Sequence, residues 1–237
     1  AAIFTGMTSN EIQRVLENAV HEAYKFLYVS PERLATPAFI EKLKRMRVCL
    51  LAVDESHCIS QWGYDFRPSY LKIAEVRQYL PAVPVLALTA TATPEVVDDI
   101  QEKLRFKEKN VFRKSFHRSN LAYVVRTTEN KEEYLLKILK NVPGTSVVYV
   151  RNRKRTKEIA DFLLQNGVSA EHFHAGLTNQ VKDARQLRWK NDETRVIVST
   201  NAFGMGIDKA EVRSVVHLDL PDSIEAYFQE AGRAGRD

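Results

Sequence analysis

Short apolar runs alternate along this chain with longer segments in which apolar residues recur at helical spacing. The runs cover residues 26–30, 48–53, 85–88, 147–150, 170–174, 195–199 and 212–218. Strands that are separated in this way by helices are typical of parallel sheets with helices packed on them. The alternation therefore predicts an α/β fold.

Helices are expected between these strands, and capping residues mark where several of them begin. Thr8 and Glu11 form a T-x-x-E capping box, and Asp222 with Glu225 is expected to cap the last helix. The other expected helices cover residues 37–46, 71–80, 131–141, 155–165, 179–190 and 222–231, with one more that begins at Pro94.

The alternation lapses in a charged, irregular stretch between residues 107 and 120 and then restarts. We place a domain boundary near residues 115–120, which divides the chain into lobes of residues 1–117 and 118–237. Each lobe is expected to hold a mainly parallel sheet flanked by helices.

Composition sets broad limits on function. The net charge of +5 and the pI near 9.1 permit a polyanionic partner without demanding one. No apolar run approaches membrane-spanning length and no signal peptide opens the chain, so a membrane role is not expected. Cys49 and Cys58 lack zinc-ligand spacing, so we expect no zinc in this segment and interpret both as buried free thiols in a reducing compartment.

The apolar run of residues 48–53 predicts a buried strand that ends abruptly in polar residues. Asp54 and Glu55 follow it directly, at the sheet edge where ligands bind in α/β folds. One carboxylate could hold a magnesium ion while the other polarises water. The alternative is a solvated acidic turn with no ligand.

The next residues form a loop rich in aromatic and polar side chains. Aromatic groups crowded with polar groups outside a helix or strand favour base stacking or a moving switch over a core role. The loop spans residues 58–70 and holds Gln61, Trp62, Tyr64, Asp65, Phe66, Arg67 and Tyr70.

A basic cluster opens the expected helix at residue 155. Cations are unfavourable at a helix N-terminus because the dipole is positive there, so a phosphate backbone is one explanation for them. A solvated surface run is the alternative. The cluster consists of Arg151, Arg153, Lys154, Arg155 and Lys157.

The last residues place arginines and glycines together. If the final helix extends to the end of the chain, Gln229, Arg233 and Arg236 form one polar stripe at i, i+4 and i+7. Two arginines that face an anion are suited to phosphoryl transfer, whereas a surface arginine stripe is the alternative. Earlier, the pair His172 and His174 lacks a local carboxylate or thiol, so we do not interpret it as a metal site.

Several of these stretches resemble motifs of the RecQ family of superfamily 2 DNA helicases. D-E-S-H followed by C-I-S-Q-W-G-Y-D-F-R-P is similar to motif II with the family's aromatic-rich loop, and Q-E-A-G-R-A-G-R-D resembles motif VI. S-P-E-R, L-T-A-T-A-T, Y-V-R-N-R-K-R-T, H-A-G-L and S-T-N-A-F-G-M-G-I-D resemble other motifs in the family's order. Ser56, Tyr64 and Asn201 are mild departures from the family pattern.

The resemblance implies two RecA-like lobes and a motor that couples ATP hydrolysis to 3′ to 5′ movement on DNA. It implies that Asp54 holds Mg²⁺, that Glu55 activates the attacking water, and that Arg233 and Arg236 meet the phosphates of ATP. Gly206, Asp208 and Gln229 would face the nucleotide. DNA contact and coupling would fall to Ser30, Arg33, His57, Gln61, Trp62, Phe66, Arg67, Thr89, Thr91, Arg151, Asn152, Arg155, His174 and Thr200.

The expected partners are single-stranded and forked duplex DNA, with a single-strand-binding protein as a possible further partner in repair and recombination. The expected location is the cytoplasm, at the nucleoid in a bacterium, or the nucleus in a eukaryote. No Gly-Lys-Ser/Thr phosphate loop occurs in the 237 residues, and we expect the first lobe to be truncated at its N-terminus and the second at its C-terminus. We also expect these residues alone to bind single-stranded DNA without hydrolysing ATP. A catalytically dead DNA-binding module is therefore an alternative, and an RNA or chromatin motor is another that the aromatic loop argues against.

Overall fold

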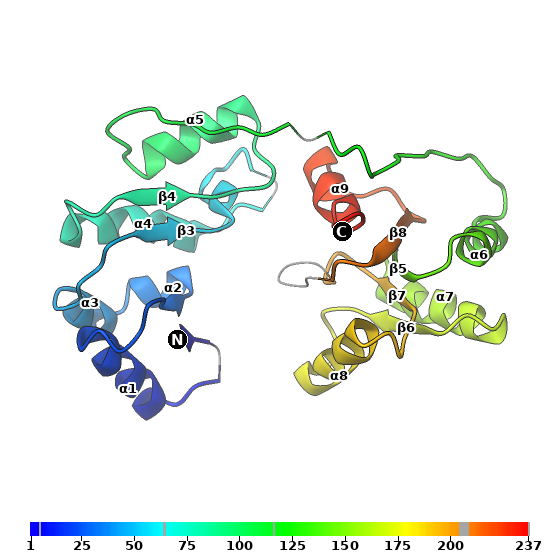
Figure 1. Ribbon diagram of the computed structural model, residues 1–237, viewed down its shortest axis with the longest axis horizontal. Helices are drawn as coiled ribbons and strands as arrows, with labels where there is room; N and C mark the ends of the chain where they lie inside the picture. The colour runs from blue at the N-terminus through cyan, green and yellow to red at the C-terminus, as the bar shows by residue number, and fades with distance from the viewer. Residues whose placement is uncertain (5, 64, 116, 204–208, 237) are drawn as a thin grey trace. The chain divides into compact units, whose positions relative to one another are not determined.

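The computed structural model describes residues 1–4, 6–63, 65–115, 117–203 and 209–236. The chain divides into two compact units, an N-terminal unit of Ala1–Phe112 and a C-terminal unit of Arg113–Asp237 (Figure 1). The sequence places the boundary slightly later, between residues 117 and 118, and that finer position stays a prediction. Among the described residues, no helix is long and apolar enough to cross a membrane.

The N-terminal unit contains two small parallel sheets covered by helices. One pairs β1 (Ala2–Ile3) with β2 (Tyr28–Val29), and the other pairs β3 (Leu51–Val53) with β4 (Val85–Ala87). Its helices are α1 (Ser9–Val20), α2 (Pro31–Leu34), α3 (Pro37–Leu43), α4 (Leu71–Val76) and α5 (Pro94–Lys103), with 3₁₀ turns η1 (Ser56–Ile59), η2 (Pro68–Tyr70) and η3 (Arg77–Tyr79).

The predicted elements of this unit are present, but several are shorter than expected. The helix expected over residues 71–80 ends at Val76 and continues as a 3₁₀ turn, and the S-P-E-R stretch forms the short helix α2. The capping box of Thr8 and Glu11 is confirmed.

The prediction that residues 48–53 form a fully buried strand is wrong for one face of the sheet. Val53 is buried in the core, whereas Leu50, Leu86 and Leu88 are exposed large apolar side chains. The prediction of two buried thiols is wrong in the same region because Cys49 is exposed and only Cys58 is buried. Alternate strand residues point to opposite faces, and only one face carries the core.

The C-terminal unit is built around a parallel four-stranded sheet in the order β6-β7-β5-β8. Its strands are β5 (Thr145–Tyr149), β6 (Ala170–Phe173), β7 (Val196–Ser199) and β8 (Val212–His217). Its helices are α6 (Lys131–Asn141), α7 (Arg153–Gln165), α8 (Asn179–Lys190) and α9 (Ile224–Ala231).

Both faces of this sheet are covered. One core cluster joins Leu139 of α6 and Ile159 of α7 to the sheet, and the other joins Phe173, Trp189 and Phe203. Full cover explains why its strands appear as continuous apolar runs in the sequence.

Side-chain caps fix where the helices of this unit begin. Asn130, Asn152 and Thr178 accept hydrogen bonds from backbone N–H groups in the first turns of α6, α7 and α8. The predicted cap of α9 by Asp222 is wrong, because Ser223 accepts the hydrogen bond from the Ala226 N–H instead.

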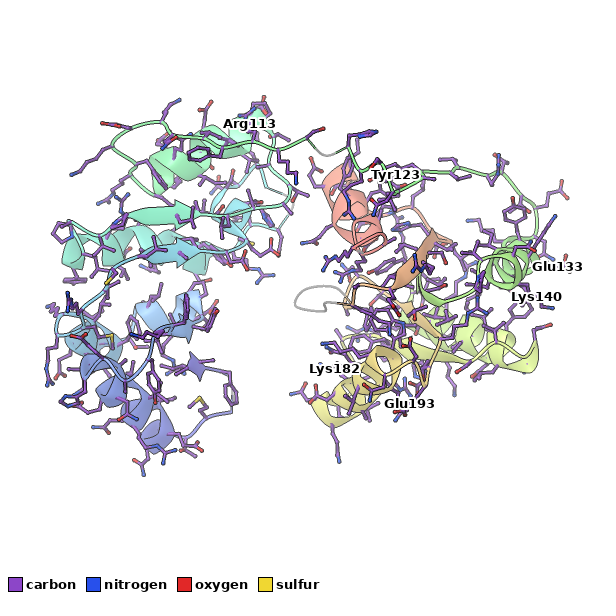
Figure 2. The ribbon with its side chains drawn as sticks, in the orientation of Figure 1. Arg113, Tyr123, Glu133, Lys140, Lys182 and Glu193 are labelled. Carbon is purple, nitrogen blue, oxygen red and sulfur yellow. The ribbon has the colours of Figure 1, made fainter. Side chains whose placement is uncertain are left out.

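The segment before α6 has little regular structure, but it is attached to the C-terminal unit at two points. The ring of Tyr123, which Figure 2 labels, lies 6.0 Å from that of Tyr227 and 6.2 Å from that of Phe228 on α9. The Asn120 side-chain amide donates a hydrogen bond of 2.8 Å to the Gly235 carbonyl. The end of the chain is therefore held against residues 117–123.

Candidate active site

The two carboxylates predicted at the end of β3 lie in a sharp turn. Glu55 has the left-handed conformation, with φ +49° and ψ +42°, which is uncommon for a residue other than glycine. The Asp54 carboxylate accepts a hydrogen bond of 2.9 Å from the Glu55 N–H. Strained backbone of this kind is concentrated at functional sites.

The surroundings of Glu55 favour its neutral form. Burial raises the pKa of the Glu55 carboxyl, and the Asp54 carboxylate raises it further, while Arg67 opposes the shift. A carboxyl whose pKa is moved upward toward neutrality is a better general base than an ordinary glutamate. Asp54 is exposed beside it, as an oxygen donor for a hard cation must be.

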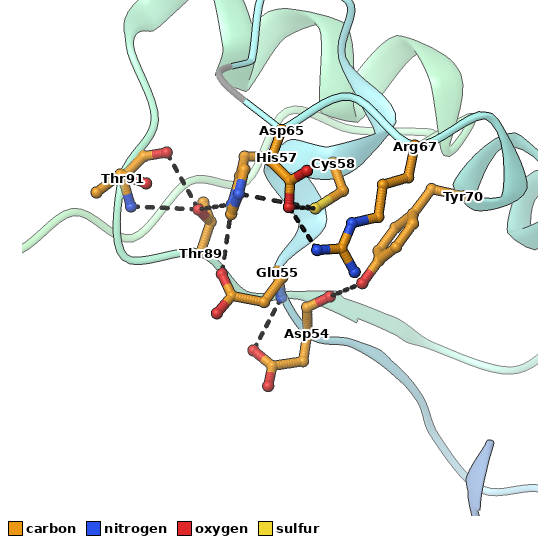
Figure 3. Close-up of polar contacts among 9 residues, drawn as sticks. All are labelled: Asp54, Glu55, His57, Cys58, Asp65, Arg67, Tyr70, Thr89 and Thr91. Atoms are coloured by element: carbon orange, nitrogen blue, oxygen red, sulfur yellow. Dashed lines mark hydrogen bonds and ion pairs between the residues drawn. The ribbon is translucent and has the colours of Figure 1, made fainter. Parts of the chain in front are cut away.

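His57 connects Glu55 to the end of the neighbouring strand. Its Nδ1 lies 3.0 Å from the Thr89 hydroxyl and 3.4 Å from the Glu55 carboxylate (Figure 3). The Thr89 hydroxyl donates to the Thr91 carbonyl at 3.2 Å, so it accepts from His57. This pattern places the imidazole proton on Nδ1. Burial lowers the pKa of His57, which favours the neutral ring.

The connection continues from His57 into the aromatic loop. The Cys58 sulfur lies 3.7 Å from Nε2 of His57 and 3.8 Å from the Asp65 carboxylate. Asp65 forms an ion pair with Arg67 at 2.5 Å. Burial raises the pKa of the Cys58 thiol to about 11, so the sulfur stays protonated. A continuous chain of contacts therefore joins Glu55 to Arg67.

Tyr70 anchors the other end of the loop. Its hydroxyl donates to the Asp54 carbonyl at 3.3 Å, and burial raises its pKa to about 12. From the sequence, Cys58 was predicted only to be a buried thiol, and Tyr70 was counted only among the aromatic residues of the loop. Their contacts with the carboxylate turn could have been suspected because both residues belong to the loop that directly follows Asp54 and Glu55 in the sequence.

The tip of the aromatic loop is open to solvent. Trp62 is 80% exposed, which excludes a core role for its ring. A small pocket of about 120 Å³ lies beside it, lined by Ile59, Gln61, Trp62, Phe66, Leu71, Asp99 and Lys103. An exposed indole next to a pocket with one cation is suited to stacking on a nucleic-acid base. Tyr64 lies outside the described residues.

Ser30 and Arg33 lie at the start of helix α2 in the same unit. Ser30 is at the N-cap position without a side-chain capping bond, and Arg33 is half-buried in the helix. Among the described residues, no hydrogen bond or ion pair joins Ser30 or Arg33 to Glu55.

The basic cluster of the C-terminal unit is partly neutralised. Arg155 pairs with Asp219 at 2.8 Å, and Arg151 pairs with Asp222 at 3.1 Å and donates to the Leu220 carbonyl. Asn152 caps helix α7 through a bond from the Lys154 N–H. The segment after β8 thus supplies carboxylates to Arg151 and Arg155, which makes these two arginines less available to a phosphate backbone than the sequence predicts.

The remaining cations of the cluster line a groove of about 420 Å³. Its lining consists of Arg153, Lys154, Lys157, Glu158, Asp161, His172 and His174. The two imidazoles stack with centroids 5.7 Å apart, and burial with nearby arginines lowers both of their pKa values. Nδ1 of His174 is buried with no hydrogen-bond partner among the described atoms.

Thr200 lies at the carboxyl end of β7. Its N–H donates to the Phe173 carbonyl at 3.3 Å, and its hydroxyl accepts from the Ala202 N–H at 3.4 Å. Gly206 and Asp208, which were predicted to face the nucleotide, lie outside the described residues.

The predicted polar stripe of Gln229, Arg233 and Arg236 does not form. Helix α9 ends at Ala231, and Gly235 has φ +62°, so the spacing of i+4 and i+7 is not helical there. Gln229 lies on α9, Arg233 is only 6% exposed, and Arg236 is exposed. Gly232, the C-cap residue, keeps a right-handed φ of −64°, so the positive φ lies further on, at Gly235.

Comparison with known proteins shows that both units of the chain match helicase families. Residues 1–100 match the DEAD/DEAH box helicase family, and residues 130–237 match the helicase conserved C-terminal domain. The chain is 44% identical over its whole length to the ATP-dependent DNA helicase RecQ of Bacillus subtilis and spans 40% of that protein. It is also 44% identical, over 90% of its length and 40% of the relative's, to a putative ATP-dependent RNA helicase of Acanthamoeba polyphaga mimivirus.

A solved structure shows the same fold at low identity. The helicase Lhr of Mycobacterium smegmatis, bound to single-stranded DNA and AMP-PNP, matches with a TM-score of 0.71 and 19% identity over the whole chain and 33% of that protein. The predicted α/β fold with two RecA-like lobes is confirmed.

Proposed function

Because this chain belongs to the RecQ family of superfamily 2 helicases, we propose that it forms the motor core of an ATP-dependent DNA helicase. The proposed motor couples ATP hydrolysis to 3′ to 5′ movement along single-stranded DNA and to unwinding of forked duplexes. The observation that carries the proposal is the chain of contacts from Glu55 through His57 and Cys58 to the aromatic loop.

The donor set at the end of β3 fits a magnesium ion and a general base. Asp54 offers an exposed carboxylate to the cation, and Glu55 accepts a proton from water. When bound, Mg²⁺ would neutralise charge on the phosphates. The Glu55 carboxylate is held near the Nδ1 proton of His57, which fixes its orientation.

DNA would act on this site through the aromatic loop. A base stacked on Trp62 would shift the loop that contains Asp65 and Arg67, and Asp65 contacts the Cys58 sulfur beside His57. His57 is in turn within reach of Glu55 and Thr89. Movement of the loop would therefore change the orientation of the general base.

The C-terminal unit would supply cations. Arg153, Lys154 and Lys157 line a groove that can follow a phosphate backbone, with Thr200 at a neighbouring strand end. Arg233 and Arg236 would meet the phosphates of ATP, as arginines do in other phosphoryl-transfer enzymes.

Glu55→Gln tests the proposed chemistry in the complete open reading frame that contains this chain. A general base supplies about 10²–10⁴-fold in rate, so ATP turnover should fall by that order while binding of ATP and DNA persists. Glu75→Gln, at an exposed glutamate paired with Lys72, is the matched control and should be fully active.

Two outcomes of this experiment would count against the proposal. Normal turnover in Glu55→Gln would remove Glu55 from the base role. Stimulation of the wild-type protein by single-stranded RNA, but not DNA, would favour an RNA motor, the class in which the mimivirus relative is named.

A further inference from the structure

Arg233 lies just beyond the end of helix α9, in a stretch of residues 232–236 that forms no helix or strand. Helix α9 ends at Ala231 and lies beside strand β8 in the C-terminal unit (Figure 1). A long side chain on irregular backbone has a fixed position only when neighbouring groups hold it there. The contacts that attach this stretch to β8 therefore decide where the Arg233 guanidinium lies.

The first attachment is the side chain of Glu230, in the last turn of α9. Its carboxylate lies 2.8 Å from Nε2 of His217, which is the last residue of β8. A carboxylate only accepts hydrogen bonds, so Nε2 carries the proton and donates it. The two side chains are only 11% and 10% exposed, and a hydrogen bond to a charged group is stronger where water is excluded. The pair thus fixes α9 at the carboxyl end of β8.

His217 is itself held by aromatic rings of two other elements. Its imidazole stacks on Tyr149 of β5 with centroids 5.3 Å apart and an interplanar angle of 17°, and the ring of Tyr227 on α9 lies 5.1 Å away. Tyr149 is only 3% exposed, and its hydroxyl donates a hydrogen bond of 2.8 Å to the Phe203 carbonyl. The partner of Glu230 therefore belongs to the buried core of the unit.

Glu230 is joined to Arg233 through the main chain. The Arg233 N–H donates a hydrogen bond of 3.3 Å to the Glu230 carbonyl. Beyond Arg233, the Gly235 N–H donates at 3.3 Å to the carbonyl of Val212, the first residue of β8. Arg233 therefore lies between two attachments to the same strand, one at each end of that strand.

The Arg233 side chain is buried within this arrangement and has a donor left over. Arg233 is only 6% exposed, and its Nε has no hydrogen-bond partner among the described atoms. Buried donors in proteins normally have a partner, so a bound anion would complete the surroundings of this guanidinium.

We propose that Glu230, through its pair with His217, is a positioning residue for Arg233. The pair fixes the last turn of α9 on β8, and the turn that follows presents the guanidinium to a phosphate of ATP. The inference rests on the proposed function, because it takes Arg233 to be a phosphate-binding arginine. Phosphoryl transfer depends mainly on positioning and charge, so a small displacement of such an arginine lowers the rate.

The test is Glu230→Ala in the complete open reading frame, which removes the attachment to His217. We expect kcat for DNA-stimulated ATP hydrolysis to fall by roughly tenfold or more, since small displacements of catalytic groups have effects of this size. The fraction of protein that binds single-stranded DNA should equal that of wild type, because the variant stays folded. Glu230→Gln keeps an oxygen that accepts from Nε2 and should restore most of the activity. Glu225→Ala, in the first turn of the same helix, is the control and should keep full activity.

A second variant separates positioning from stability, and it decides the question if Glu230→Ala fails to fold. His217→Phe combined with Glu230→Leu replaces the pair by apolar side chains of similar size and keeps a ring on Tyr149. Such replacements of buried pairs often leave stability unchanged or higher, so Tm should not fall, whereas kcat should fall as in Glu230→Ala. Wild-type kcat in either variant, or equal kcat values for Glu230→Gln and Glu230→Ala, would overturn the inference. Loss of folding in the apolar variant would overturn it too, because the pair would then hold the fold rather than Arg233.

A double-mutant cycle distinguishes this inference from the proposed function. Arg233→Ala should lower kcat strongly, and Glu230→Ala should have no further effect in that background. Additive effects would overturn the inference and leave the proposed function intact. Normal kcat in Arg233→Ala would remove the phosphate role of Arg233 and this inference with it, but the proposed function would survive that result as long as Glu55→Gln is inactive.

Discussion

At the scale of single residues, Glu55 combines features that oppose folding. Its left-handed backbone conformation costs on the order of 1–3 kcal/mol in a residue with a side chain. Its carboxylate is partly buried and lies next to Asp54, and both conditions raise its pKa. Active sites commonly contain such groups because function requires the strained, desolvated arrangement. We therefore expect stability to improve when the charge at residue 55 is removed.

Glu55→Gln should increase the free energy of unfolding at neutral pH in magnesium-free buffer. A carboxyl whose folded pKa is raised stabilises the fold below its unfolded pKa, near the ordinary value of 4.5, and loses that contribution as pH rises through the folded pKa. Glutamine does not titrate, so the gain in the free energy of unfolding should be absent below pH 4.5 and should grow as the pH rises above that value. Urea unfolding across a pH series measures it.

The matched control for this series is Glu75→Gln, because Glu75 is exposed and pairs with Lys72 at 3.0 Å. It should show no gain at pH 7. A Glu55→Gln protein that is no more stable than wild type at pH 7, or equally stabilised at every pH, would contradict the argument.

At the scale of elements, helix α7 shows how a basic helix N-terminus is tolerated. The Asp219 carboxylate accepts a hydrogen bond of 3.1 Å from the Arg151 backbone N–H and forms an ion pair with the Arg155 guanidinium. One carboxylate of the segment after β8 therefore satisfies a backbone donor and neutralises a cation of the cluster. On the groove side, Lys157 has no ion pair among the described residues. Arg155, which is paired with a carboxylate, and Lys157, which lines the groove, should therefore contribute differently to DNA binding.

Lys157→Gln and Arg155→Gln test that difference in residues 1–237. Loss of one phosphate contact lowers the slope of log K against log salt by about 0.7 for single strands, so Lys157→Gln should reduce it by about that amount. Arg155→Gln should leave the slope nearly unchanged and lower Tm, because Asp219 loses its ion-pair partner. Fluorescence anisotropy over a salt series measures the slopes, and equal slopes for the two variants would refute the distinction.

The same elements show what a sequence can predict. The strands of the C-terminal unit and the Thr8–Glu11 capping box were predictable because burial on both faces and local caps leave local patterns. The pairing of Arg155 with Asp219 was not, because it depends on strands β5 and β8 lying side by side. The helical stripe through Arg233 was wrong because helix α9 ends at Ala231, before both arginines.

At the scale of the whole molecule, the two units divide the proposed work. The N-terminal unit holds the carboxylates and the aromatic loop, and the C-terminal unit holds the basic groove and the arginines. Their cores differ, since the four-stranded sheet is covered on both faces while β3 and β4 leave large apolar side chains exposed on one. In the proposed motor, DNA bound at the aromatic loop acts on Glu55 through contacts within the N-terminal unit.

The measurement that tests this claim most directly is ATP hydrolysis with and without single-stranded DNA by Trp62→Ala, in the complete open reading frame. Loss of one stacked base removes about 1–3 kcal/mol of binding, so stimulation by DNA should be lost while the basal rate persists. Trp62→Phe keeps an aromatic face and should retain most of the stimulation. An equal fall in basal and stimulated rates, or full stimulation in Trp62→Ala, would contradict the account.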